Sequence, residues 1–215
     1  MRGINERTNS KLNDLDLFCD YGEIDQNWVW TAKLSMTSNL LFSVGFDQIL
    51  KIWNLDEYKI EHYYEFHSDE IVRSLALTPD GRFLFYGGED CCLKVWKLEE
   101  KKLIINLGKI LDSWILSICV SYCGSYVIVG GKDGYLSQLS VPHLMERRPP
   151  EEFMVKEYGR AHEGCIYNIF CGTDGNFFFT LDTDRRLKQW DFKGRVMVCD
   201  YGALPGYEVM VADIC

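Results

Sequence analysis

The sequence lacks an apolar run of the roughly 20 residues that a bilayer-spanning helix needs. It begins after Met1 with the polar stretch RGINERTNSKLND, which is unlike a signal peptide. The C-x-x-C spacing of zinc ribbons is also missing, and nine cysteines, an odd number, do not suit a secreted disulfide framework. We therefore expect a soluble, cytoplasmic protein with reduced thiols and no membrane partner.

Positive charge and histidine are scarce as well. Lysine and arginine number 23 against 32 acidic residues, which gives a formal charge of −9. Such a charge repels a phosphate backbone, so we expect no nucleic-acid partner, and a basic protein or peptide is favoured instead. The four histidines form no H-E-x-x-H or Cys-His constellation, and G-x-S-x-G and phosphate-loop motifs are absent. We predict no catalytic residue, cofactor or metal site.

One pattern recurs four times along the chain. The copies are LFSVGFDQILKIWNL (41–55), LFYGGEDCCLKVWKL (84–98), IVGGKDGYLSQLSV (128–141) and FFTLDTDRRLKQWDF (178–192). Each joins an apolar run, a turn with an aspartate, and an alternating strand that carries Trp or Leu six residues after that aspartate. The aspartates Asp47, Asp90, Asp133 and Asp184 are 43, 43 and 51 residues apart. Strands before and after each copy bring the total to four per period, which predicts an all-β propeller of four-stranded antiparallel blades.

The repeats resemble the WD-repeat family from residue 15 onward. His162, Thr180, Asp184 and Trp190 fill the family's His, Ser/Thr, Asp and Trp pattern, and Asp191 completes the Trp-Asp pair. The resemblance implies that these four side chains form a buried hydrogen-bonded chain within one blade. The other blades keep parts of the pattern, namely His67, Asp90 and Trp96 in the second, Ser43, Asp47 and Trp53 in the first, and Asp133 alone in the third. We assign Asp90 a structural role in its turn.

The order of the repeats predicts the boundaries of the domain. We expect a flexible segment at 1–14, an outer strand at 15–22, blades at about 27–66, 69–108, 112–159 and 162–202, and the first strand of a fifth blade at 207–215. Families of this kind usually need six to eight blades, so the ring is expected to be incomplete and the sequence to be a fragment of a longer propeller. An unpaired open end could also support self-association, or completion of the ring by a second copy. The longer third interval maps to PHLMERRPPEEF (142–153), which we interpret as a solvated loop on the face opposite the binding face.

The family resemblance also predicts which residues surround the top entrance of the propeller. The predicted partner-binding residues are Trp28, Trp30, Phe46, Arg73, Glu89, Trp114, Lys132, Tyr167 and Met210. Tryptophan, tyrosine and arginine are enriched in interaction hot spots. We therefore predict a non-catalytic scaffold that binds a peptide segment or a subunit of another protein on this face. The alternative is a propeller enzyme of hydrolase type whose site lies in blades absent from this sequence.

Overall fold

Sixteen strands in the described part of the chain form four antiparallel sheets of four strands each. The computed structural model describes residues 28–35, 37–57, 59–65, 71–172 and 174–205. The first two sheets contain β1 (Val29–Leu34), β2 (Leu40–Gly45), β3 (Ile49–Asn54) and β4 (Lys59–Glu65), then β5 (Val72–Leu77), β6 (Phe83–Gly88), β7 (Cys92–Lys97) and β8 (Lys102–Lys109). The other two contain β9 (Ile115–Val120), β10 (Tyr126–Gly131), β11 (Tyr135–Ser140) and β12 (Met154–Arg160), then β13 (Ile166–Cys171), β14 (Phe177–Asp182), β15 (Arg186–Asp191) and β16 (Val196–Ala203).

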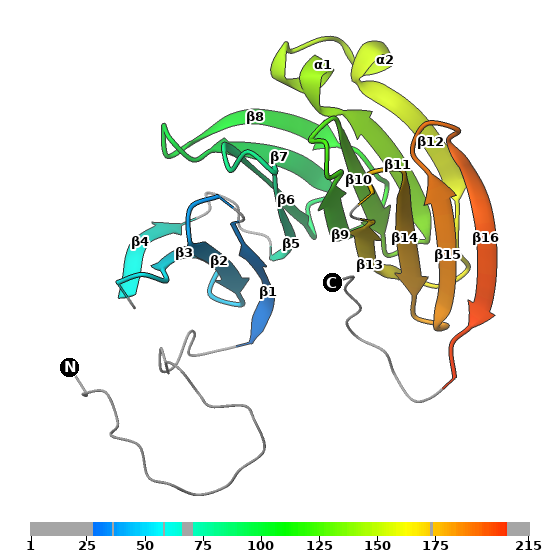
Figure 1. Cartoon of the computed structure of the whole chain (residues 1–215), viewed down its shortest axis with the longest axis horizontal. Helices are drawn as coiled ribbons and strands as arrows, with labels where there is room; N and C mark the ends of the chain where they lie inside the picture. The colour runs from blue at the N-terminus through cyan, green and yellow to red at the C-terminus, as the bar shows by residue number, and fades with distance from the viewer. Residues whose placement is uncertain (1–27, 36, 58, 66–70, 173, 206–215) are drawn as a thin grey trace, which may run out of the picture.

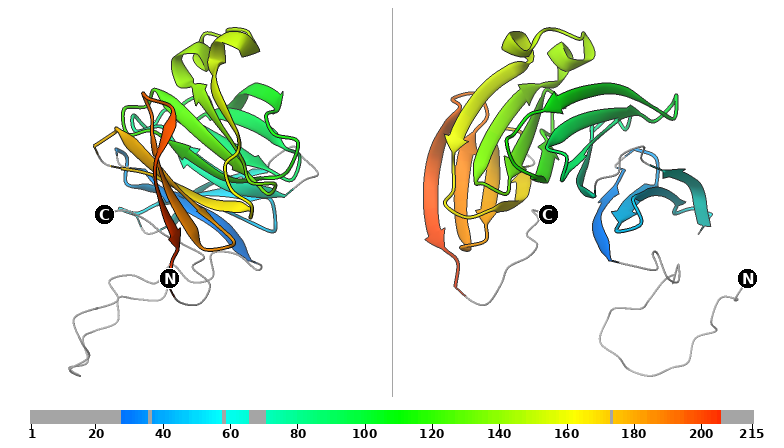
Figure 2. Two further views of the ribbon diagram at one scale, coloured as in Figure 1. Left: turned by 90° about the vertical axis from the view of Figure 1, so that its right-hand side faces the viewer. Right: turned by 180° about the vertical axis from the view of Figure 1, so that it is seen from behind.

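The sheets follow one another around an open arc (Figures 1 and 2). Their first strands, β1, β5, β9 and β13, lie on the inner side of the arc and contact one another in turn. Their fourth strands, β4, β8, β12 and β16, lie on the outer side. The all-β, four-bladed prediction is thus confirmed, and the described sheets do not close into a ring.

The hydrophobic core consists of three layers, each between two neighbouring sheets. Because successive residues of a strand face opposite sides, neighbours in sequence enter different layers. Leu84 packs with the first sheet, whereas Phe85 packs with the third. In β10, Val127 and Val129 face the second sheet and Ile128 faces the fourth. Middle strands covered on both faces explain the unbroken apolar runs in the sequence.

Two serine side chains bind the inner strands of neighbouring sheets together. The amide of Ile118 donates to Ser74 Oγ at 2.9 Å, and the amide of Ile169 donates to Ser117 Oγ at 2.9 Å. Both serines are buried. They occupy the same position of β5 and β9, so the same connection is used twice along the arc.

The insertion after β11 is helical and not the loop that we predicted from its prolines, although most of its residues are exposed to solvent as expected. Residues Val141–Met145 form helix α1 and residues Pro150–Phe153 form helix α2, on the outer side of the arc (Figure 1). Proline fits the first turn of a helix, because the amide that it lacks has no partner there. Leu144 and Phe153 are buried in the layer between the second and third sheets, which is why this segment is held against the protein.

Three predictions fall outside the described residues. These are the flexible segment at 1–14, the outer strand at 15–22 and the first strand of a fifth blade at 207–215. The predicted site residues His67 and Met210 are also outside them.

Candidate interaction surface

A β-bulge near the start of each inner strand sets the geometry of the candidate surface. In β1, Val29 pairs with Gly45 and Thr31 with Val44, which leaves Trp30 as the extra residue. The same shift leaves Arg73 out of the ladder in β5 and Tyr167 in β13. A bulge re-aims the side chain of its extra residue. Three of the predicted partner-binding residues therefore occupy one repeated backbone position.

Each turn after the second strand of a sheet returns to the start of the inner strand. The amide of Phe46 donates to the carbonyl of Trp28 at 2.9 Å, and the amide of Lys132 donates to that of Trp114 at 3.0 Å. Glu89 makes the equivalent bond, to Ile71, at 3.1 Å. These backbone bonds place Phe46 beside Trp28, Lys132 beside Trp114, and Glu89 beside Ile71.

Five of the predicted residues form a continuous series of ring and cation contacts, which we call the tryptophan ladder. Its members are Trp28, Trp30, Arg73, Trp114 and Lys132. The rings of Trp28 and Trp30 meet edge to face with centroids 5.7 Å apart. The guanidinium of Arg73 lies 3.9 Å from the Trp30 ring centroid and 5.7 Å from that of Trp114, and Lys132 Nζ lies 3.9 Å from the Trp114 centroid. The ladder thus spans three sheets.

Burial decreases from the middle of the ladder to its first member. Trp30 and Trp114 are half-buried, whereas Trp28 is 75% exposed. Phe46, beside Trp28, is also exposed. Cation–π contacts at such sites contribute about 0.5–2 kcal/mol each, so the half-buried rings are held in place while the outer aromatics face solvent.

An ion pair balances the charge of Arg73 in the ladder, and further pairs lie in the adjacent turns. Arg73 Nε donates to Glu89 Oε1 at 3.0 Å. In the adjacent turns Asp47 pairs with Lys51 at 2.7 Å and Asp90 pairs with Lys94. The ladder is therefore a mainly aromatic surface in which Arg73 is paired with Glu89 and Lys132 lies over the ring of Trp114.

The fourth sheet contains a fully buried hydrogen-bonded chain. Trp190 Nε1 donates to Thr180 Oγ1 at 2.8 Å, and Thr180 Oγ1 lies 2.6 Å from His162 Nε2. His162 Nδ1 lies 2.7 Å from Asp182 Oδ2, and both side chains are inaccessible to solvent. Burial lowers the pKa of His162, although Asp182 opposes this shift. A neutral imidazole satisfies the whole chain if Nδ1–H donates to Asp182 and the Thr180 hydroxyl donates to Nε2.

The carboxylate of this chain is Asp182, so the prediction of Asp184 was wrong. Thr180 and Asp182 are two residues apart on β14 and face the same side of the sheet, where His162 bonds to both. Asp184 follows in the turn and is exposed. The amide of Arg186 also donates to Asp182, at 2.8 Å, as turn amides donate to Asp47, Asp90 and Asp133 in the other sheets.

The other sheets retain parts of the pattern. In the first, Trp53 Nε1 donates to Ser43 Oγ at 2.9 Å. In the second, Tyr86 and Trp96 are buried, and burial raises the pKa of the Tyr86 phenol. Asp90 holds its own turn by accepting from the amide of Cys92 at 3.1 Å, which agrees with a structural role.

The repeated sheets, the hydrogen-bonded chain and the turn aspartates agree with a comparison against family models. The model described as "WD domain, G-beta repeat" matches residues 20–54, 58–97 and 104–138, just over half of the chain. The chain belongs to the WD40 family. A search of curated proteins finds no match. The fourth WD40 blade lies outside the matched residues, yet it contains the most complete hydrogen-bonded chain.

Sequence reasoning missed two features of the WD40 structure. Gln138 is fully buried, accepts from Tyr158 Oη at 2.7 Å and donates to the Phe192 carbonyl of the next blade at 3.3 Å. It lies beside Leu139, the residue that replaces tryptophan in the third repeat, and that replacement was the available signal. The second feature is a groove at the helical insertion, described below. No group of three or more potential metal ligands occurs among the described residues, and no helix in the described ranges has the length and apolarity to cross a membrane.

Proposed function

We propose that this chain is a non-catalytic scaffold that binds a peptide segment or a subunit of another protein through the tryptophan ladder. WD40 repeats are typical of protein-interaction scaffolds. The observation that carries the proposal is the series of contacts from Trp28 to Lys132 across three blades. Rigid aromatic and arginine side chains with an exposed end are what interaction hot spots contain.

The bound segment is proposed to place an apolar or aromatic anchor between Trp28 and Phe46. Both side chains are exposed, and the hydrogen bond between their residues keeps them adjacent. The net charge of the chain favours a basic partner, and the pairing of Arg73 with Glu89 leaves recognition at the centre of the ladder to the aromatic rings. Tyr167 occupies the equivalent bulge of β13 and would extend the contact by one blade.

The proposal is tested by substitution of the exposed end of the ladder. Trp28→Ala and Lys132→Glu should each reduce recovery of partners in quantitative affinity purification, because each removes a member of the tryptophan ladder. Both residues are exposed, so neither substitution should disturb the core. Tyr63→Ala is the matched control, since Tyr63 is 61% exposed and lies on the outer strand of the first blade, away from the ladder. Equal partner recovery by all three variants would contradict the proposal.

The alternative function is a propeller enzyme of hydrolase type. Nothing in the described residues favours it. Turnover on panels of ester, phosphate and glycoside substrates that is insensitive to Trp28→Ala would favour the enzyme over the scaffold.

A further inference from the structure

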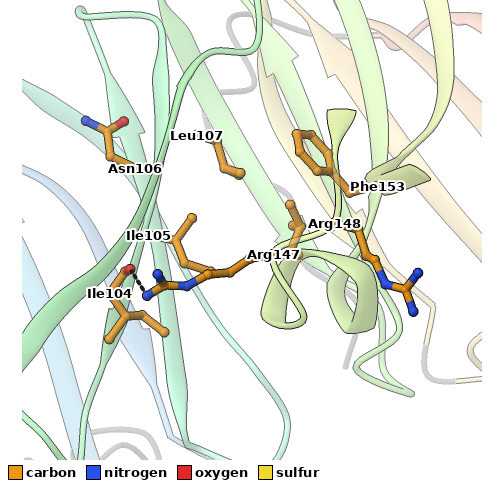
Figure 3. Close-up of a pocket in the computed structure, with 8 residues that line it drawn as sticks. Ile104, Ile105, Asn106, Leu107, Arg147, Arg148 and Phe153 are labelled. Atoms are coloured by element: carbon orange, nitrogen blue, oxygen red, sulfur yellow. Dashed lines mark hydrogen bonds between the residues drawn. The ribbon is translucent and has the colours of Figure 1, made fainter. Parts of the chain in front are cut away.

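A groove lies along the outer edge of the second blade, between β8 and the helical insertion of the third blade. Two adjoining hollows, of about 290 and 380 Å³, share Ile104, Ile105 and Arg147. Leu144 and Phe153 add apolar surface to the first hollow. Figure 3 shows Arg147 reaching toward Ile104, while Arg148 points away from the strand. The groove is on the outer side of the arc and shares no residue with the tryptophan ladder.

The insertion is built to hold Arg147 over β8. Leu144 and Phe153 are buried on either side of it and anchor both short helices. Arg147 has a φ of 56°, a left-handed conformation that costs a non-glycine residue on the order of 1 kcal/mol or more. Its Nη2 donates to the carbonyl of Ile104 at 3.4 Å. The buried anchors therefore maintain a strained residue whose charge faces the neighbouring blade.

The edge of β8 can accept another strand. β8 is the last strand of its sheet among the described residues, so one edge has no strand partner. Val95 pairs with Ile105 and Trp96 with Leu103, which leaves Ile104 as a bulge residue that is not paired with β7. An edge with unpaired backbone groups is a template for an extended segment. Arg147 holds the Ile104 carbonyl only at the long limit of hydrogen-bond distance, so an incoming amide can replace it.

Most of the basic side chains at the groove are already paired with glutamates. Its lining contains Lys97, Lys102, Arg147 and Arg148 together with one carboxylate, Glu100, and Lys97 and Lys102 both pair with that carboxylate. Hydrogen bonds from Lys102 and Lys97 lower the pKa of Glu100 to about 2, so Glu100 remains ionised and paired with these two lysines. Arg148 is bonded to two glutamates. No carboxylate in the described residues is within ion-pair distance of Arg147.

We propose that this groove binds an extended acidic segment of a partner protein, which adds as a strand to the edge of β8. Its aliphatic side chains cover Ile104 and Leu107, and a carboxylate pairs with Arg147. This second interaction surface is independent of the tryptophan ladder, so a single chain could hold two partners.

The experiment measures binding of short fluorescent peptides by anisotropy, with the whole chain. One peptide alternates valine with glutamate, a second alternates valine with lysine, and both have a Gly-Ser tail for solubility. We expect the acidic peptide to bind at least about tenfold more tightly than the basic one, and added salt to weaken that binding. Equal affinities, or no binding of the acidic peptide, would overturn the proposal.

Two variants locate the binding. Arg147→Glu should weaken the acidic peptide about tenfold or more, whereas Lys193→Glu, the same charge change on the exposed turn before β16, should not. Trp28→Ala should leave peptide binding unchanged, which separates this proposal from that for the ladder. Equal effects of Arg147→Glu and Lys193→Glu would show nonspecific attraction and refute the site. Dimers of the chain that dissociate in Arg147→Glu would identify a second copy as the occupant and also refute it.

Discussion

Replacing Asp182 by alanine should destabilise the protein far more than replacing Asp184. The Asp182→Ala change removes the acceptor of His162 Nδ1 and of the Arg186 amide. A donor left without an acceptor in a buried site costs about 1–3 kcal/mol, so the loss should be about 2–4 kcal/mol. For a chain of this size that corresponds to a fall of roughly 5–15 °C in Tm. Asp184 is exposed in the turn, and its removal should change stability by less than about 0.5 kcal/mol.

The assay is thermal unfolding followed by circular dichroism, with the wild type, Asp182→Ala and Asp184→Ala at the same concentration and scan rate. Asp182→Asn adds an internal control, because an amide oxygen can still accept from His162 while the charge is lost. It should fall between the wild type and Asp182→Ala. A Tm for Asp184→Ala as low as that of Asp182→Ala would refute the assignment of Asp182 to the hydrogen-bonded chain.

Three further predictions concern the framework. Burial lowers the pKa of His162 in the folded state, so below the ordinary histidine pKa the unfolded chain binds more protons than the folded one, and the free energy of unfolding should fall as the pH falls. Denaturant titrations at several pH values test this. The same dependence of the unfolding free energy on pH in His162→Gln would contradict it. Gly134→Ala should cost roughly 2–4 kcal/mol, since Gly134 has a φ of 80° and an added Cβ would lie 2.0 Å from the His162 carbonyl oxygen; a Tm within a degree or two of the wild type would be the contrary result. Ser117→Ala leaves the Ile169 amide without its acceptor and should cost about 1–3 kcal/mol, whereas Ser38→Ala, at an exposed turn, should have little effect; the two urea midpoints are compared, and equal midpoints would argue against the connection.

Much of the fold could be predicted from the sequence because the repeat is local. The spacing of Asp47, Asp90 and Asp133 marks one turn per blade. Consecutive apolar residues such as Leu84 and Phe85 indicate strands that are covered on both faces. Spacing alone could not select the carboxylate of the fourth blade. Asp182 is on the same strand face as Thr180, whereas Asp184 lies beyond the end of β14. The spacing of the repeats does not show at which residue β14 ends.

The candidate surface was predicted more completely than the groove. The residues at the bulges, Trp30, Arg73 and Tyr167, recur at one place in each repeat, so alignment of the repeats finds them. Arg147 lies in an insertion that occurs once, and its partner Ile104 is 43 residues away in another blade. The other repeats have no counterpart of this insertion, so alignment of the repeats assigns Arg147 no partner, and the segment was predicted to be a solvated loop.

The distribution of the core into separate layers determines the order in which the blades should unfold. The second and third blades each contribute to two layers, whereas the first and fourth, among those described, contribute to one. Loosening of the first blade would expose a single layer and leave the rest of the arc intact, while loosening of the third would release both of its neighbours at once. Unfolding should therefore proceed by fraying from the flanks inward, and amide protons in β6 and β10 should be the slowest to exchange.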